Sequence, residues 1–246
     1  MESDSRGLFL DNLHIRSTES TPVFLRDLTL CLDESGYRTP EVCAGRYDAK
    51  KSAQSVLALH RRLNQDAVVG CVHHVGMDIE ALGGEMSYAD YGIPSITKHP
   101  FQEMPESLPE PDMLGQLPQV LESYRLVSHG LRGKAALVCN LEGPVTKAAL
   151  LRGMENLAMD MELQPDLAHE VVRFAIEQGK LFIEGVSEAS SPDAVFFASA
   201  TDNPDILGIE NVMRHSIPGL RSLVAKARSL DMLTVFHPHG DLSHDR

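Results

Sequence analysis

The sequence is short of positive charge. Its 246 residues include 22 Lys and Arg against 35 Asp and Glu, which gives a net charge of −13 at pH 7. Nucleic acids and anionic lipid surfaces bind proteins through clustered cations, so we expect neither as a partner. A local basic pocket for an acidic small molecule is still compatible with this balance.

Targeting and membrane signals are also missing. Residues 1–6 contain no basic region followed by an apolar core, so no signal peptide is predicted. No apolar run approaches the roughly 20 residues that span a bilayer. The four cysteines form no Cys-x-x-Cys pair, and reduced, mostly buried thiols are typical of cytosolic proteins. We therefore expect a cytoplasmic location.

What the sequence does contain is an alternation of apolar segments with helical patterns. Hydrophobic residues make up 43% of it, which is enough for a buried core. Several of the apolar segments are apolar throughout, as buried parallel strands are. The predicted strands are 21–25, 66–72, 135–139, 193–198 and 232–236; the predicted helices are 48–63, capped by Asp48, 118–130, 146–160, a long one from 165, and 210–230 with a break at Pro218.

This alternation predicts right-handed βαβ units and a parallel α/β sheet. A doubly wound open sheet and a (β/α)8 barrel both fit, but no glycine-rich phosphate loop follows the first strand, which weakens the nucleotide-binding open sheet. Five units over 246 residues suit the spacing of a barrel, which would need about three more. We expect one incomplete barrel domain over 1–246, with a proline-rich surface excursion at 94–118.

Polar side chains follow several of the predicted strands, at the ends where parallel folds gather functional groups. Asp78 and Glu80 follow the second strand and could act as acid or base, or form a solvated polar loop. Asp202 follows the fourth strand and could recognise a substrate or cap a turn. His237 and His239 follow the fifth strand. They could bind a metal, although zinc normally takes three or four ligands, or they could belong to a histidine-rich chain end.

Together these segments resemble the uroporphyrinogen decarboxylase superfamily, which includes the haem-pathway decarboxylase and the corrinoid-dependent methyltransferases. The resemblance runs from about Thr21 to Gly240. It implies a (β/α)8 barrel whose pocket lies at the C-terminal mouth, with about the first five units present here and with Tyr37, Glu41 and Asp202 as substrate-binding residues. The motifs that carry it are Thr21-Pro22-Val23, Gly36-Tyr37 with Pro40-Glu41, Glu80-Ala81-Leu82-Gly83, Gly143-Pro144 and His237-Pro238-His239-Gly240.

The methyltransferase branch resembles this sequence more than the decarboxylase does. The decarboxylase holds its carboxylate-rich substrate with arginines before a Gly-Arg-Tyr-x-Pro-Glu pattern, whereas residues 30–35 here include two acids and no arginine. The methyltransferase pattern is an acidic pair ending Glu-Ala-Met-Gly, which Asp78 and Glu80-Ala81-Leu82-Gly83 match in register. Its zinc motif, His-x-Cys-Gly, matches His237-Pro238-His239-Gly240 with His239 in place of the cysteine.

The function that this resemblance implies is methyl transfer between a small methyl donor or acceptor and a corrinoid (methylcobalamin) protein. In that branch zinc binds a substrate thiol and lowers its pKa, so that the thiolate attacks the methyl group on cobalt. Asp78 and Glu80 would be the catalytic residues, and His237 and His239 would be zinc ligands. The third ligand of the branch, a late cysteine, has no counterpart before Arg246, and strands six to eight are expected to be missing. A uroporphyrinogen decarboxylase-type carboxy-lyase and a non-catalytic incomplete barrel are the alternatives.

Overall fold

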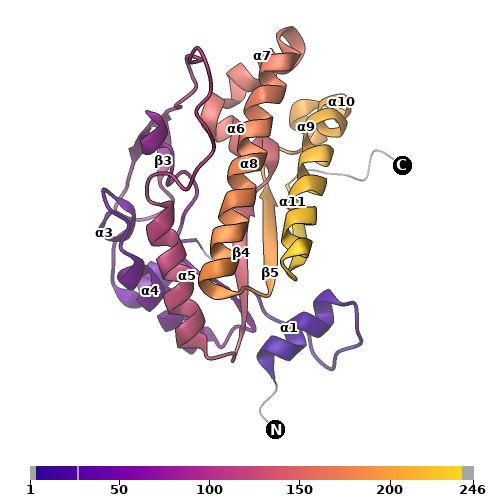
Figure 1. The fold of residues 1–246 in the computed structure, drawn as a ribbon. Helices are drawn as coiled ribbons and strands as arrows, with labels where there is room; N and C mark the ends of the chain where they lie inside the picture. Colours follow the sequence, from indigo (N-terminus) through magenta and orange to yellow (C-terminus); the bar gives the residue numbers. More distant parts are fainter. Residues whose placement is uncertain (1–3, 27, 240–246) are drawn as a thin grey trace.

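The computed structural model describes residues 4–26 and 28–239, and its main sheet is parallel and backed by helices (Figure 1). The order of the main sheet is β1-β4-β5-β6. A single parallel bridge from Phe24 to Ala67 extends it beyond β1. The strands are β1 (Ala67–Val69), β4 (Ala136–Glu142), β5 (Ala194–Ser199) and β6 (Leu233–Pro238).

The strand order decides between the two predicted architectures. Within the main sheet the strands lie side by side in chain order, as in a barrel, whereas a doubly wound sheet reverses its order partway. Hydrogen bonds among the described strands do not close the sheet into a full barrel. The prediction of a barrel-type α/β fold is confirmed, as an open arc of parallel strands.

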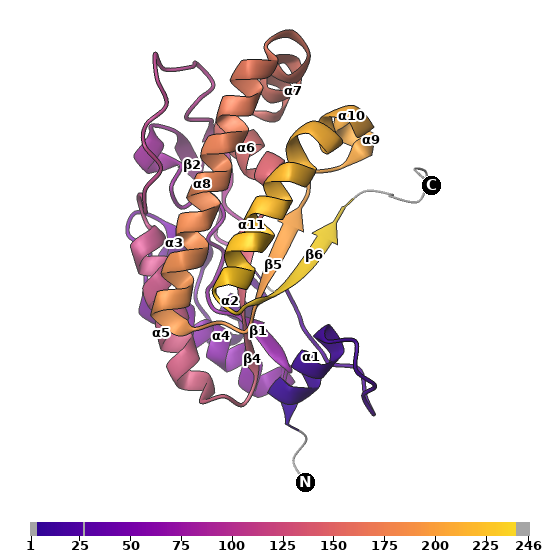
Figure 2. The same ribbon diagram turned by 45° about the vertical axis from the view of Figure 1, so that its right-hand side comes forward.

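One face of the sheet is covered by helices (Figures 1 and 2). Their apolar sides pack against Leu137, Cys139 and Leu141, which alternate along β4. Asp48 begins the first of these helices as predicted, because its carboxylate accepts hydrogen bonds from the N–H groups of Lys50 and Lys51. The helices are α4 (Ala49–Leu63), α5 (Leu117–Leu131), α8 (Pro165–Ser190) and α11 (Ile217–Ser229).

The other face of the sheet, here called the inner face, is formed by the alternate strand residues, among them Ala136, Val138 and Phe196. Helix α1 (Ser5–Leu13) covers its lower end, near the start of the strands (Figure 2). Phe9 of α1 packs edge-on against Phe24, with ring centroids 5.7 Å apart, and Phe24 packs in the same way against Phe196 at 5.8 Å. Apolar contacts therefore fill this end of the inner face and leave the C-terminal strand ends to polar groups.

Shorter elements connect these layers. A 3-10 turn (Glu80–Leu82) and an antiparallel hairpin of β2 (Glu85–Ser87) and β3 (Ser95–Lys98) lie between β1 and α5. The predicted excursion at 94–118 thus begins with a strand and continues without regular structure from 99 to 116. No helix in the described ranges is long and apolar enough to cross a membrane. The remaining helices are α2 (Leu30–Ser35), α3 (Thr39–Cys43), α6 (Pro144–Arg152), α7 (Met154–Leu163), α9 (Pro204–Leu207) and α10 (Ile209–Asn211).

Three predicted elements differ in extent. The strand expected at 66–72 covers only Ala67–Val69. The helix expected at 146–160 is two helices, α6 and α7, because Gly153 between them has a φ of +84°, which a helix cannot continue through. The strand expected at 21–25 shrinks to the bridge at Phe24. The N–H groups on either side of Phe24 donate to the side chains of Asp66 and Gln65, which take the place of a neighbouring strand.

The helix predicted at 210–230 is irregular just before Pro218, as expected. A π-helical turn (Val212–Ser216) separates α10 from α11, and Pro218 stands at the second position of α11. The π-helical turn changes the hydrogen-bonding pattern just before Pro218, which has no N–H to donate to the preceding turn.

Candidate functional site

Four side chains from separate parts of the chain meet on the inner face, and we call them the inner-face cluster: Arg26, Asn140, Phe196 and His237. Arg26 Nε donates a hydrogen bond to Asn140 Oδ1 at 2.7 Å. The guanidinium carbon lies 5.4 Å from the centre of the Phe196 ring. The His237 ring lies 5.5 Å from the same ring. The cluster therefore runs across three neighbouring strands, from β4 to β6.

The inner-face cluster is positioned partly by a helix. Pairing of β1 with β4 stops at Val69 and Val138, so the backbone N–H of Asn140 has no strand partner on that side. It donates instead to the hydroxyl of Tyr124 of α5, at 3.0 Å. Gly70 leaves room for this insertion, because a Cβ there would overlap the Tyr124 ring.

Charge in the inner-face cluster comes from Arg26. Burial lowers the pKa of its guanidinium, and the negative charge of nearby Glu142 opposes part of that effect. Sequence reasoning missed both Arg26 and Asn140. The available signal was a lone cation directly after the first apolar segment, in a chain that has few cations.

Asp78, a predicted catalytic residue, is buried in an ion pair. Its two carboxylate oxygens lie 2.6 and 2.8 Å from Nζ of Lys147, and Nε2 of Gln178 approaches at 3.4 Å. Burial lowers the pKa of Lys147, but attraction to Asp78 and Glu142 outweighs it, so that pKa is raised. Sequence reasoning missed Lys147, whose signal was a cation in the middle of the otherwise apolar stretch of helix α6.

The ion pair borders a small cavity of about 30 Å³ that is also lined by His74, Glu142 and Phe182. Burial lowers the pKa of His74 to about 3, and that of the adjacent His73 to about 4. Both imidazoles are therefore neutral at pH 7. His74 stacks on Phe182 of α8 with ring centroids 5.1 Å apart. Both nitrogens of His73 lack a hydrogen-bond partner among the described residues.

Glu80 does not join Asp78. It is exposed in the 3-10 turn, where its carboxylate accepts a hydrogen bond of 3.2 Å from the hydroxyl of Tyr88. Asp78 is 1% exposed and contacts Lys147. The two predicted catalytic carboxylates thus have separate partners. Glu80 contacts Tyr88 at the surface, and Asp78 contacts Lys147 in the interior.

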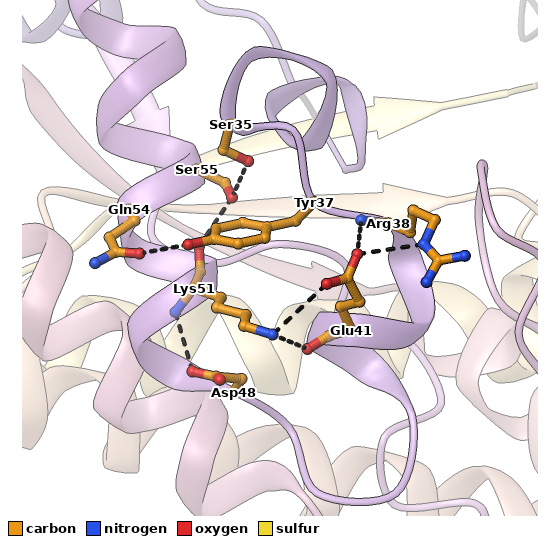
Figure 3. Close-up of polar contacts among 8 residues, drawn as sticks. All are labelled: Ser35, Tyr37, Arg38, Glu41, Asp48, Lys51, Gln54 and Ser55. Carbon is orange, nitrogen blue, oxygen red and sulfur yellow. Dashed lines mark hydrogen bonds and ion pairs between the residues drawn. The ribbon is translucent and has the colours of Figure 1, made fainter.

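Tyr37 and Glu41, predicted to bind substrate, lie together in a surface network around Lys51 of α4 (Figure 3). The Tyr37 hydroxyl donates to Gln54 at 3.1 Å, and Lys51 Nζ lies 5.2 Å from the centre of the Tyr37 ring. A hydrogen bond from the backbone N–H of Arg38 lowers the pKa of Glu41, helped by the Arg38 side chain. Tyr37 packs against the helix-side core, so this network lies on the face of the sheet opposite to the inner-face cluster.

Asp202, also predicted to bind substrate, caps helix α6. Its carboxylate accepts hydrogen bonds from the N–H of Val145 at 3.1 Å and from the N–H and hydroxyl of Thr146 at 3.0 and 2.8 Å. These contacts join the loop after β5 to the start of α6, a stabilising geometry for a helix N-terminus. The carboxylate is 2% exposed and its acceptor sites are largely used.

His237 and His239, the predicted metal ligands, lie side by side at the C-terminal end of β6, with ring centroids 4.8 Å apart. Burial lowers the pKa of His237, as do the charges of His239 and Arg26, which favours the neutral form that binds metals. Residues 4–26 and 28–239 contain no group of three His, Cys, Asp or Glu side chains that could hold a metal ion. The described residues thus contain the two predicted zinc ligands and do not complete a zinc site. Gly240 of the predicted motif lies outside the described residues.

The chain is similar to known methyltransferases. A methylated-thiol–coenzyme M methyltransferase of Methanosarcina mazei is 24% identical over 176 residues, which are 69% of this chain and 46% of that protein. The chain thus spans about half the length of this curated relative. A solved methyltransferase from Methanosarcina mazei has the same fold, with a TM-score of 0.80 at 23% identity, over 97% of this chain and 70% of that one.

The family model for uroporphyrinogen decarboxylase (URO-D) matches residues 5–244. This match covers nearly the whole chain, and it agrees with the family predicted from the motifs between Thr21 and Gly240. The chain belongs to the uroporphyrinogen decarboxylase (URO-D) family.

Proposed function

We propose that this chain is a methyltransferase-like member of its family, which moves a methyl group between a small substrate and a corrinoid protein. The observation that carries the proposal is the inner-face cluster, which places a cation, an amide and an imidazole at the C-terminal ends of parallel strands. Barrel enzymes bind their substrates at that end. The name of the Methanosarcina mazei relative, a methylated-thiol–coenzyme M methyltransferase, supports the same class of reaction.

In this proposal the chain supplies His237 and His239 to a zinc site that needs at least one further ligand. The buried pair of Asp78 and Lys147 holds the loop after β1 against α6. It thereby fixes one side of the small cavity that the pair borders. The corrinoid, as methylcobalamin, comes from a partner protein, and the reaction takes place in the cytoplasm. Substrate contacts by the other predicted residues stay predictions: Glu80, Tyr37, Glu41 and Asp202.

The test is methyl transfer by the purified full chain, incubated with methylcobalamin, coenzyme M and zinc. Loss of the methyl group is followed through the visible absorption of the cobalamin. We expect transfer that His237→Ala abolishes, together with a lower zinc content in His237→Ala and His239→Ala. His129→Ala, an exposed histidine in the last turn of α5, is the matched control and should change neither. Equal transfer and equal zinc in the wild type and His237→Ala would refute the proposed site.

Decarboxylation of a porphyrinogen is the second candidate, favoured by the name of the family model. The arginine of the Gly36 to Glu41 motif, Arg38, argues against it. Its side chain is 52% exposed and pairs with Glu41 and Asp90 on the outer surface, away from the inner face. A substrate with eight carboxylates would therefore meet few cations in the pocket. We expect no release of CO2 from uroporphyrinogen, and turnover of that substrate would overturn this conclusion.

A non-catalytic role is the third candidate, and the open edge of the sheet favours it. Phe236 on β6 is 45% exposed, and it borders an apolar groove of about 630 Å³ beside α11. An apolar surface of this kind is typical of a site that another polypeptide covers. Protein that is monomeric, metal-free and inactive in both assays would support this alternative.

A further inference from the structure

A groove of about 300 Å³ lies between the ends of α4 and α5, at the opposite end of the sheet from His237. Helix α5 ends there, and the chain then turns into β4 (Figure 1). None of the described residues that line the groove is an acid, although acids outnumber Lys and Arg by 35 to 22 in the chain. The groove is therefore a basic site in an acidic protein. Its polar lining consists of His60, Arg61, His129, Arg132 and Lys134.

The three permanent cations of the groove, Arg61, Arg132 and Lys134, are exposed and form no ion pair within residues 4–26 and 28–239. Arg62, the residue after Arg61, does form one, because its Nε lies 3.1 Å from a carboxylate oxygen of Glu34. The helix dipole stabilises cations in the last turn of a helix, which accounts for Arg61 in α4. It does not account for Lys134, which lies two residues beyond the C-cap of α5. Like charges repel, so their gathering here indicates a ligand of opposite charge.

Local structure brings the cations of the two helices together. Gly130 lets α4 and α5 approach closely, because a Cβ at that position would overlap the side chain of Leu57. Arg132 then caps the end of α5 with a φ of +51°, a left-handed conformation that residues with a side chain rarely adopt. Backbone strain of this kind is concentrated at functional sites, so the conformation of Arg132 is a second reason to expect a ligand here.

His60 adds an uncharged hydrogen-bonding group to the same groove. It is half-buried, and its Nδ1 has no hydrogen-bond partner in the part of the chain that the structure describes. Burial lowers the pKa of His60 below its ordinary 6.5, and the positive charge of Arg61 lowers it further. The imidazole is therefore neutral at pH 7 and carries one N–H donor beside the cations. Asp66, the acid that acts on this pKa, already accepts a hydrogen bond from the N–H of Val23.

We propose that this groove binds the phosphate group of a small molecule. The planar guanidinium groups of Arg61 and Arg132 match the oxygens of a phosphate, and Lys134 adds a third charge. A volume of about 300 Å³ suits a small ligand. A nucleic acid would need more cations than these three, and the net charge of −13 would repel its other phosphates. The site goes beyond the proposed function, because it lies at the far end of the sheet from the strand ends where methyl transfer is proposed.

The experiment is isothermal titration calorimetry of the full chain at pH 7 and physiological ionic strength, with inorganic phosphate and AMP as the probes. We expect both probes to bind to the wild type. Arg61→Gln and Lys134→Gln should each weaken the binding about fivefold or more, since each removes a charged hydrogen bond. Arg62→Gln is the matched control. It makes the same change in net charge one residue away, outside the groove, and should bind as the wild type does.

Binding of neither probe, or equal binding by the wild type, Arg61→Gln and Lys134→Gln, would overturn the phosphate site. An equal loss in Arg61→Gln and Arg62→Gln would also overturn it, because it would show attraction to the net charge alone. Tighter binding of AMP identifies an organic phosphate as the ligand, and equal affinities identify free phosphate; either result supports the groove. The substituted side chains are exposed, so the variants should keep the circular dichroism of the wild type. If one groove variant fails to fold, the other decides the question.

Discussion

The buried pair of Asp78 and Lys147 gives the sharpest prediction of stability. The two side chains are 2% and 12% exposed, so removing the Lys147 charge leaves a carboxylate that water cannot easily reach. Breaking such a pair costs about 3–5 kcal/mol, far above the 0–1 kcal/mol of an exposed pair. We therefore expect Lys147→Met to lower the free energy of unfolding by about 3–5 kcal/mol. The melting temperature should fall by about 6–20 °C, since a chain of this size loses about 2–4 °C per kcal/mol.

The assay is urea unfolding followed by circular dichroism, with thermal melts of the same samples. Lys180→Met is the matched control, because Lys180 pairs with Glu177 at a similar distance, 2.7 Å, but with side chains 29% and 47% exposed. It should change the unfolding free energy by less than about 1 kcal/mol. The double variant Asp78→Asn with Lys147→Met should regain part of the loss, because the buried charge of Asp78 is removed and only the Glu142 carboxylate still lacks the attraction of Lys147. A loss in Lys147→Met as small as that in Lys180→Met would refute the buried pair.

Three further predictions use the same measurements. Gly70→Ala should destabilise the fold by about 1–3 kcal/mol, since the new methyl group overlaps the fully buried Tyr124 ring; unchanged unfolding would contradict the close approach. Asp202→Ala should cost about 1–2 kcal/mol in urea unfolding through the lost cap of α6, whereas an effect on activity alone would point to substrate binding. In the folded protein the pKa values of His73 and His74 lie below their ordinary 6.5, at about 4 and about 3. The two histidines therefore bind protons more readily in the unfolded chain than in the folded one. Stability should therefore be fully present above pH 6.5 and decline toward pH 4, and His74→Phe should flatten that decline.

The fold was predictable where burial leaves a direct mark on the sequence. The segments 135–139 and 194–198 are apolar throughout because both of their faces are covered, one by helices and the other by the inner-face residues. The turn at Gly153 was not predictable, since apolar residues continue on both sides of it and only its positive φ ends α6. The segment 21–25 was expected as a full strand. Its own residues do not indicate that the side chains of Asp66 and Gln65 would accept the hydrogen bonds that a neighbouring strand normally accepts.

The candidate site was predictable only in part, for a related reason. His237, His239 and Asp78 attract notice because they directly follow apolar strands. Arg26 and Lys147 are recognised only through partners far away in the sequence: Arg26 meets Asn140 across 114 positions, and Lys147 meets Asp78 across 69. A single cation carries no local pattern that reveals such a contact, and the contact exists only once the strands and α6 are assembled.

The hydrogen bond from Asn140 to Tyr124 links the two sides of the sheet. The ring of Tyr124 belongs to the helix layer, whereas the Asn140 side chain belongs to the inner face. A substitution on α5 can therefore displace Asn140 without altering any side chain on the inner face. Natural variation or directed evolution could in this way tune the affinity for an inner-face ligand from the outer helices, and Tyr124→Phe is the smallest such change.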